Sequence, residues 1–169
     1  MLIRRLAPPD STALQALRLA ALRDVPSAFH ASYDEEKDLP ISATEEQLKI
    51  ATDRGVFGAF EDAVLVGIVA LGRQGMRKLQ HKAFVWSMYV IPQFRGKGAG
   101  RALLLEALTL ARSVRGLLQV NLGVNASNVP AIRLYESVGF KVFGREPGAL
   151  LIDGVLHDEL HMLLRIDES

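Results

Sequence analysis

Residues 82–124 constrain the fold of this 169-residue chain more than any other segment. Lys82–Ile91 is rich in aromatic and β-branched residues, which predicts a strand, and Pro92 ends it. Gly98–Val114 is predicted to be a long helix because its apolar residues recur at helical spacing. Its apolar face carries Leu104, Ala107, Leu108 and Ala111. Leu117–Val124 has the composition of another strand, so the order predicts two strands joined by a crossover helix.

The rest of the chain adds strands that pair in hairpins, together with shorter helices. Strands are expected at Leu2–Leu6, Gly55–Phe60, Val64–Leu71, Phe140–Ile152 and Val155–Ile166. Helices are expected from Ser11 to near Pro26, within Ser27–Leu39, over Thr44–Thr52 after a capping box at Ser42, and over Pro130–Ser137. The sequence therefore predicts a single α/β domain over residues 1–169. It has a mixed, mostly antiparallel sheet of about six or seven strands and about four flanking helices.

The composition excludes several classes of protein. The hydrophobic fraction of 49% and the charged fraction of 23% are those of an ordinary globular domain. The chain has no cysteine, which excludes disulfides, a thiolate nucleophile and a cysteine-ligated metal site. No apolar run reaches the ~18 residues of a membrane span, and the first ten residues lack the apolar region of a signal peptide. We therefore expect a cytoplasmic protein with no membrane partner.

The net charge of +1 conceals an uneven distribution of charged residues. Residues 63–105 contain seven basic residues and no acidic one, which leaves 13 basic residues against 19 acidic ones elsewhere. This distribution predicts two opposed electrostatic fields. Nucleic acid is not an expected partner, because the basic stretch Arg73–Lys82 has few interleaved aromatic residues and the pI is only about 8.1.

The segment Val90–Arg101, between the predicted strand and the long helix, has the composition of a phosphate-binding loop. Gly96, Gly98 and Gly100 permit positive φ and a close approach of backbone N–H groups to a ligand. The N-terminus of the following helix adds unpaired N–H groups and a positive dipole. The loop is not a Walker A motif, since no Ser or Thr follows its Gly-Lys pair, and its glycines lack the spacing of a dinucleotide fingerprint. The ligand expected here is a phosphate or pyrophosphate.

This segment resembles the signature of the GNAT superfamily of acetyl-CoA-dependent N-acetyltransferases, Gln/Arg-x-x-Gly-x-Gly/Ala. The signature is matched twice, once from Gln93 and once from Arg95. A second stretch, Asn128–Phe140, is similar to the family's Asn…Ala…Tyr…Gly-Phe segment, and the order of the predicted elements agrees over nearly the whole chain. The resemblance implies the fold of this family, in which the central sheet is splayed at the cofactor site.

The resemblance implies acetyl-CoA as the acetyl donor and no metal. The pyrophosphate would be held by backbone N–H groups, assisted by the charges of Arg95, Lys97 and Arg101. The N–H groups implied are those of Gly96, Lys97, Gly98, Ala99, Gly100 and Arg101. Met88, Tyr89 and Val90 match a strand that bulges beside the pantetheine arm, where a backbone N–H would polarise the thioester carbonyl. Asn128 matches a residue that contacts this arm, and it is also a candidate N-cap for the following helix.

The resemblance further implies direct transfer to a primary amine within a ternary complex, and the absence of cysteine agrees with this. Tyr135 matches the general acid that protonates the departing thiolate, and packing on the sheet is the alternative role for this tyrosine. One cation of the stretch Arg73–Lys82 is expected to bind the adenosine 3′-phosphate. A non-catalytic acyl-CoA-binding sensor with the same fold stays open as an alternative function, and a homodimer stays open as an assembly.

The general base is left open, because residues 80–91 contain no acid where several family members place a glutamate. The candidates are His81, Ser87, Tyr89, Glu35, Glu36, Glu61, Glu159 and His161. The acidic residues Asp34, Glu35, Glu36 and Asp38 lie in the region that usually lines the acceptor side. They would attract a cationic amine. His157 and His161 are not expected to bind a metal, since four residues along a strand separate them by ~13 Å.

Overall fold

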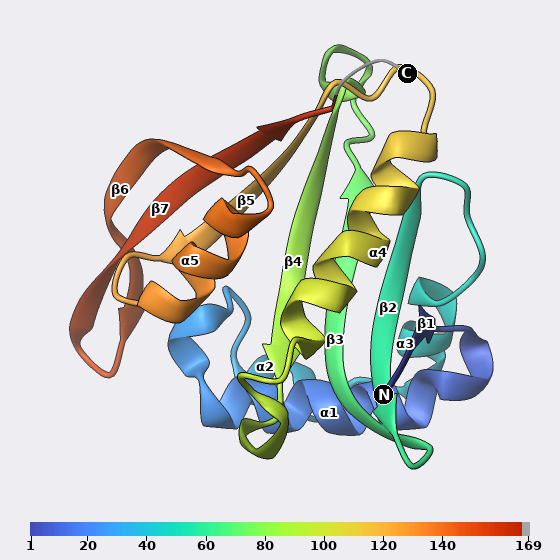
Figure 1. The fold of residues 1–169 in the computed structure, drawn as a ribbon. Helices are drawn as coiled ribbons and strands as arrows, with labels where there is room; N and C mark the ends of the chain where they lie inside the picture. Colours follow the sequence, from blue (N-terminus) through green and yellow to red (C-terminus); the bar gives the residue numbers. More distant parts are fainter. Residues whose placement is uncertain (167–169) are drawn as a thin grey trace.

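The computed structural model describes residues 1–166, which form one seven-stranded sheet with helices on both faces (Figure 1). The strands are β1 (Leu2–Arg5), β2 (Arg54–Glu61), β3 (Val64–Arg73), β4 (Lys82–Val90), β5 (Gln119–Asn125), β6 (Lys141–Ile152) and β7 (Val155–Arg165). The α-helices are α1 (Ser11–Asp24), α2 (Tyr33–Glu36), α3 (Ile41–Gln47), α4 (Ala99–Ser113) and α5 (Val129–Ser137). The strand order is β1-β2-β3-β4-β5-β7-β6. The predicted mixed α/β sheet is confirmed, with seven strands.

Among the described residues, β4 and β5 are the one parallel pair of neighbouring strands. The helix α4 connects them, as the strand–helix–strand pattern predicts. Figure 1 shows α4 and α5 over one face of the sheet and α1, α2 and α3 over the other. No helix within residues 1–166 has the length and apolar character that crossing a bilayer requires.

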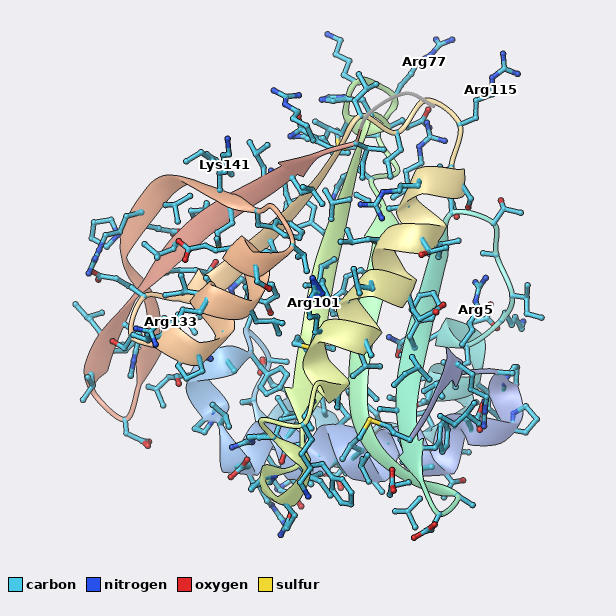
Figure 2. All side chains as sticks on the ribbon, viewed as in Figure 1. Arg5, Arg77, Arg101, Arg115, Arg133 and Lys141 are labelled. Atoms are coloured by element: carbon cyan, nitrogen blue, oxygen red, sulfur yellow. The ribbon has the colours of Figure 1, made fainter. Side chains whose placement is uncertain are left out.

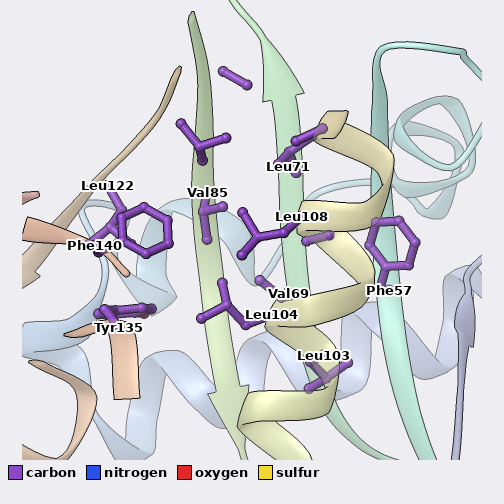
Figure 3. Close-up of a cluster of buried hydrophobic side chains, with 14 of the residues drawn as sticks. Phe57, Val69, Leu71, Val85, Leu103, Leu104, Leu108, Leu122, Tyr135 and Phe140 are labelled. Atoms are coloured by element: carbon purple, nitrogen blue, oxygen red, sulfur yellow. The ribbon is translucent and has the colours of Figure 1, made fainter. Parts of the chain in front are cut away.

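The helix α4 is held on the sheet by its apolar face. All four residues of the predicted face are fully buried. Leu104 and Leu108 share one core cluster with Val69 and Leu71 of β3 and Val85 of β4 (Figure 3). Burial of each leucine side chain is worth ~1.5–3 kcal/mol, so this contact fixes the position of the helix. The glycine loop that precedes α4 is thereby held at one end of the sheet.

The predicted position of the third helix is wrong. α3 covers Ile41–Gln47 rather than Thr44–Thr52, and Ser42 lies in its first turn instead of capping it. Pro40 determines where α3 starts. Its ring disfavours a helical conformation in the residue before it, and proline has no backbone N–H to donate within a helix. The helix ends at Gln47, and the side chain of its C-cap residue, Leu48, turns into the core on the α1 side of the sheet.

A bidentate ion pair ties β1 to the turn before α1. The Arg4 guanidinium donates to both carboxylate oxygens of Asp10 at 2.8 Å, and the backbone N–H of Ala7 donates to Asp10 Oδ2 at 2.8 Å. The hydrogen bonds from Arg4, more than the one from Ala7, hold the pKa of Asp10 below its usual value. A lowered folded-state pKa stabilises the protein above the unfolded-state value of about 3.9. This stability is lost as the pH falls through the folded-state value.

Asp10→Asn is therefore expected to lower the free energy of unfolding by about 1 kcal/mol at pH 7, the usual scale for a partly exposed pair. The loss should shrink as the pH is lowered towards about 2, because protonation of the wild-type carboxylate weakens the ion pair there as well. Calorimetric unfolding at both pH values measures this difference, with Asp38→Asn as a control for removal of an exposed carboxylate. An equal loss of stability at both pH values would contradict this role of the ion pair.

Candidate active site

The strands β4 and β5 separate part-way along their length and open a wedge in the middle of the sheet (Figure 1). Within the described part of the chain, they pair only from Lys82 with Gln119 to Phe84 with Asn121. Beyond this point each strand continues without pairing to the other. We use "the wedge" for the space between β4 beyond Phe84 and β5 beyond Asn121. The splayed sheet that the family resemblance implies is therefore present.

A β-bulge in β4 lies inside the wedge. In the register with β3, Trp86 pairs with Ala70 and Tyr89 pairs with Ile68, so β4 has one residue more than β3 between these pairs. Ser87 has a φ of +56°, which is unusual for a residue with a side chain. A bulge bends its strand and increases the local twist, which agrees with the divergence of β4 from β5. It lies next to the segment predicted to face the pantetheine arm.

A cavity of about 630 Å³ lies at the wedge, between the start of α4 and α5. It brings together most of the predicted cofactor-binding residues, namely Met88, Tyr89, Val90, Arg95, Gly96, Gly98, Ala99, Gly100, Arg101 and Asn128. Lys97 does not line the cavity, since its exposed side chain lies over the ring of Phe94, with Nζ 5.0 Å from the ring centroid. Tyr135 does not line it either, although Ala131 and Leu134 of the same helix do.

The loop before α4 presents backbone N–H groups to this cavity. Gly98 is the N-cap of α4 with a φ of +85°, and Gly96 has a φ of +72°. The N–H of Ala102 donates to the carbonyl of Gly98, so the three N–H groups before it have no partner within the helix. In Figure 2 the side chain of Arg101 lies beside α4, on the side that faces α5. Unpaired N–H groups, a helix dipole and a cation together suit an anionic group.

The side chain of Arg95 contacts two neighbouring segments of the protein, β4 and the end of α1. Its Nε donates to the carbonyl of Val90 at 2.8 Å, and its Nη2 lies 2.6 Å from a carboxylate oxygen of Asp24, the last residue of α1. The hydroxyl of Tyr89 donates to the same oxygen at 3.0 Å. Burial, and then the hydrogen bond to Asp24, raises the pKa of Tyr89, so its phenol stays protonated at neutral pH and is a poor candidate base. Asp24, which the sequence analysis missed, joins α1 to β4 and to the loop.

Tyr135 is buried on the inner side of α5, with a relative exposure of 6%. Its ring packs edge-on against Phe140, with centroids 5.9 Å apart (Figure 3). Its hydroxyl has no hydrogen-bond partner among residues 1–166. Within these residues, a buried side-chain nitrogen or oxygen atom that lacks a hydrogen-bond partner always retains some exposure to solvent. The hydroxyl therefore keeps some contact with solvent. Burial raises the pKa of Tyr135, which keeps the phenol in its proton-donating form.

Asn128 has the capping role that the sequence predicts. Its Oδ1 accepts a hydrogen bond from the N–H of Ala131 at 3.3 Å and so caps α5. Asn128 also lines the cavity. Its contact with a pantetheine arm stays a prediction.

Several candidate bases are engaged in structural contacts. Glu35 accepts hydrogen bonds from the backbone N–H and hydroxyl of Ser32 and closes the capping box of α2. Glu36 forms a bidentate pair with Arg18 at 2.9 and 3.0 Å. Glu61 lies at the end of β2, two strands away from the wedge, and pairs with the N-terminal amine. Of the four acids expected to form a rim near the acceptor, Glu36 and Asp34 are therefore ion-paired, the latter with Lys37.

Glu159 differs from these acids because it is the one buried carboxylate among the described residues, with a relative exposure of 7%. It lies in β7, and its Oε2 is 2.8 Å from Nε2 of His30. His30 comes from the loop between α1 and α2 and was not among the residues singled out from the sequence. No local pattern could have found this pair, because 129 residues separate its members.

The basic residues of the acid-free stretch do not form one field. β4 has nine residues, so its two ends are roughly 26 Å apart. Lys82 and the preceding turn with Arg77 lie at the end of the sheet remote from the glycine loop (Figure 2). The expectation that a cation of Arg73–Lys82 binds the adenosine 3′-phosphate is therefore wrong, because these side chains lie at the opposite end of α4 from the loop.

The family model described as "Acetyltransferase (GNAT) family" matches residues 19–140. An uncharacterised N-acetyltransferase of Mycobacterium bovis is 32% identical over 112 residues, which are 66% of this chain and 67% of that protein. A mycothiol acetyltransferase of Acidothermus cellulolyticus is 48% identical over 62 residues, 37% of this chain, and the match covers only 19% of that relative's length.

Solved structures agree in fold over almost the whole chain. A GNAT-family acetyltransferase from Streptococcus pneumoniae superposes with a TM-score of 0.89 at 23% identity and covers 98% of this chain and 99% of its own. A GNAT-superfamily phosphinothricin acetyltransferase from Sinorhizobium meliloti, solved in complex with acetyl-CoA, has a TM-score of 0.82 at 18% identity, covering 99% and 89%. With the family model matched across the glycine loop, the wedge and α5, this chain belongs to the GNAT acetyltransferase family.

Proposed function

We propose that this chain transfers the acetyl group of acetyl-CoA directly to a primary amine, within a ternary complex. The observation that carries the proposal is the position of the wedge, which opens beside the N–H groups at the start of α4. If the pyrophosphate is bound by those N–H groups, the extended pantetheine arm runs along β4 towards the bulge at Ser87. Acceptors named for relatives include spermidine, for an acetyltransferase of Thermoplasma acidophilum that is 33% identical over 85 residues.

The position of each residue around the cavity then determines its role. The start of α4 and its loop bind the pyrophosphate, and a backbone N–H of the segment from Met88 to Val90 polarises the thioester carbonyl. Asn128, on the opposite wall of the cavity, contacts the arm. Tyr135 donates its phenolic proton to the thiolate as the C–S bond breaks. Lys97 contributes its backbone N–H only, since its side chain does not line the cavity.

Titration calorimetry with acetyl-CoA, followed by thiol-release assays over a panel of primary amines, tests this function. We expect binding and release of coenzyme A with at least one amine of the panel. Binding without any release would favour the acyl-CoA-binding sensor instead. Absence of binding would contradict both functions.

Asp24→Asn is expected to raise KM for acetyl-CoA about 3–5-fold, with kcat nearly unchanged. The substitution keeps the shape of the side chain but removes the charge that holds Arg95, and a half-exposed ion pair of this kind is worth up to about 1 kcal/mol. The loop would then lose part of its fixed position beside the cavity. Steady-state kinetics measures the change, and Asp34→Asn, which removes an exposed acid of α2, is the control. An unchanged KM would mean that Asp24 does not position the loop.

A further inference from the structure

Acetyl transfer to an amine needs a group that removes a proton from the attacking nitrogen. Such a base must reach the thioester carbon, carry a negative charge or a free lone pair, and have a route by which its proton can leave. Glu159, the one buried carboxylate among the described residues, lies in β7 beside β5, which forms one wall of the wedge.

The carboxylate of Glu159 reaches across β5 towards the wedge. In the β5–β7 register, Glu159 pairs with Asn125, which lines the cofactor cavity. The Glu159 side chain leans over Gly123 of β5, since a Cβ atom at Gly123 would lie only 2.2 Å from Glu159 Oε1. Gly123 is two residues beyond Asn121, the last residue of β5 that pairs with β4. The absence of a side chain at Gly123 therefore gives the carboxylate its place at the edge of the wedge.

His30 links this buried carboxylate to solvent. Its Nε2 lies 2.8 Å from Glu159 Oε2, while 73% of the His30 side chain is exposed. The segment before it, the turn Pro26–Ala28, contacts β5 and β6, so the loop that carries His30 is fixed against the same part of the sheet. A proton accepted by Glu159 can therefore pass through one hydrogen bond to an exposed imidazole.

The other ionisable groups near Glu159 are arranged differently. A ring nitrogen of His161, on the same strand, and a carboxylate oxygen of Glu146, on β6, lie within 4.8 Å of the Glu159 carboxylate. They pair with each other, with His161 Nε2 3.1 Å from Glu146 Oε2. His161 lies on β7, opposite Gly123 of β5, and its ring is held by Glu146. The Glu146 side chain is 56% exposed and comes from β6, on the other side of β7 from β5. Glu146 is therefore a matched control for the charge of Glu159.

We propose that Glu159 is the general base of the acetyl transfer and that His30 carries its proton to solvent. The proposal rests on the proposed function. The neutral amine adds to the thioester carbonyl carbon, and the nitrogen, now positively charged, gives one proton to the Glu159 carboxylate. The C–S bond then breaks, and Tyr135 gives its proton to the sulfur. The proton on Glu159 leaves through His30 to water, and Tyr135 regains a proton from water, so the products are the amide and coenzyme A.

The first test is Glu159→Gln, assayed with an amine that the wild-type protein acetylates. We expect kcat to fall at least 100-fold, the lower end of the range for loss of a general base, with the calorimetric Kd for acetyl-CoA unchanged. Glu146→Gln is expected to stay within twofold of wild type. His30→Ala should lower kcat about tenfold without changing KM for acetyl-CoA. A Glu159→Gln variant within threefold of wild-type kcat would overturn this proposal and leave the proposed function intact.

The second test separates proton transfer from a structural role. Glu159→Ala leaves room for a small molecule beside His30, and formate is expected to restore turnover in proportion to its concentration. Formamide, which has the same shape and no charge, should restore nothing. Equal effects of the two molecules, or no effect of either, would overturn the assignment of Glu159 as a base. Absence of turnover in the wild-type protein itself would instead contradict the proposed function.

A third variant leaves Glu159 in place and moves its carboxylate. Gly123→Ala puts a Cβ where the carboxylate lies, so we expect a loss of kcat of at least tenfold with a folded protein and unchanged acetyl-CoA binding. Gly144→Ala on β6 is the matched control, since no atom lies within 4 Å of its added Cβ. Full activity of Gly123→Ala would contradict the position assigned to the carboxylate.

Discussion

Tyr135→Phe is expected to lower kcat by ~100-fold or more while the Kd for acetyl-CoA stays the same. The change removes only the hydroxyl, which has no hydrogen-bond partner among the described residues, so the packing against Phe140 is kept. The thiolate of coenzyme A would then leave without a proton donor. Single-turnover kinetics of thiol release, with calorimetry for binding, measures the two quantities separately.

The control for this variant is Tyr33→Phe on α2, whose ring stacks on the guanidinium of Arg23 far from Tyr135 in the sequence. It should retain wild-type kcat. Since the pKa of Tyr135 is raised by burial, wild-type kcat should show no alkaline decline from this residue below about pH 10. A Tyr135→Phe enzyme with normal kcat would leave Tyr135 as a core residue only.

Gly98→Val is expected to weaken acetyl-CoA binding by about 100-fold. A β-branched residue at a φ of +85° costs at least ~1–2 kcal/mol, and relief of this strain moves the backbone N–H groups at the start of α4. Loss of one charge-assisted hydrogen bond to the pyrophosphate then costs ~1.5–3 kcal/mol of binding free energy. Because 1.4 kcal/mol corresponds to a factor of ten, a loss near the upper end of this range gives the expected change in Kd.

The matched control is Gly154→Val, in the hairpin between β6 and β7. Gly154 has a φ of +77° and no atom within 4 Å of an added Cβ, so its backbone strain is similar. It lies outside the cavity, and we expect lower stability with an unchanged Kd for acetyl-CoA. Calorimetric titration of both variants decides the point, and equal losses of affinity would assign the effect of Gly98→Val to general destabilisation.

The sequence predicts the parts of this protein that depend on neighbouring residues. The apolar face of α4 and the capping of α5 by Asn128 are visible because the residues involved lie within a few positions of one another. The prediction of α3 failed at the same scale, since a capping-box spacing competed with Pro40 and the proline set the helix start.

The contacts that complete the site could not be read in this way. Asp24 meets Arg95 across 71 residues, and His30 meets Glu159 across 129. Neither pair has a recurrent spacing, because each depends on how α1 and its following loop dock on the sheet. The assignment of the basic stretch before β4 to the cofactor failed for the same reason. These basic residues are close to the glycine loop in the sequence, but the nine residues of β4 separate them from it in space.

The separation of β4 from β5 also bears on how the protein avoids aggregation. Two strand edges with unpaired backbone groups lie in the interior of the sheet, where most proteins have none. Strands at the outer rim are commonly protected by charged side chains or prolines. Here the two edges face each other across the wedge, so a chain that pairs with one of them is flanked by the other. An extended ligand arm bound in the wedge would therefore cover both edges at once.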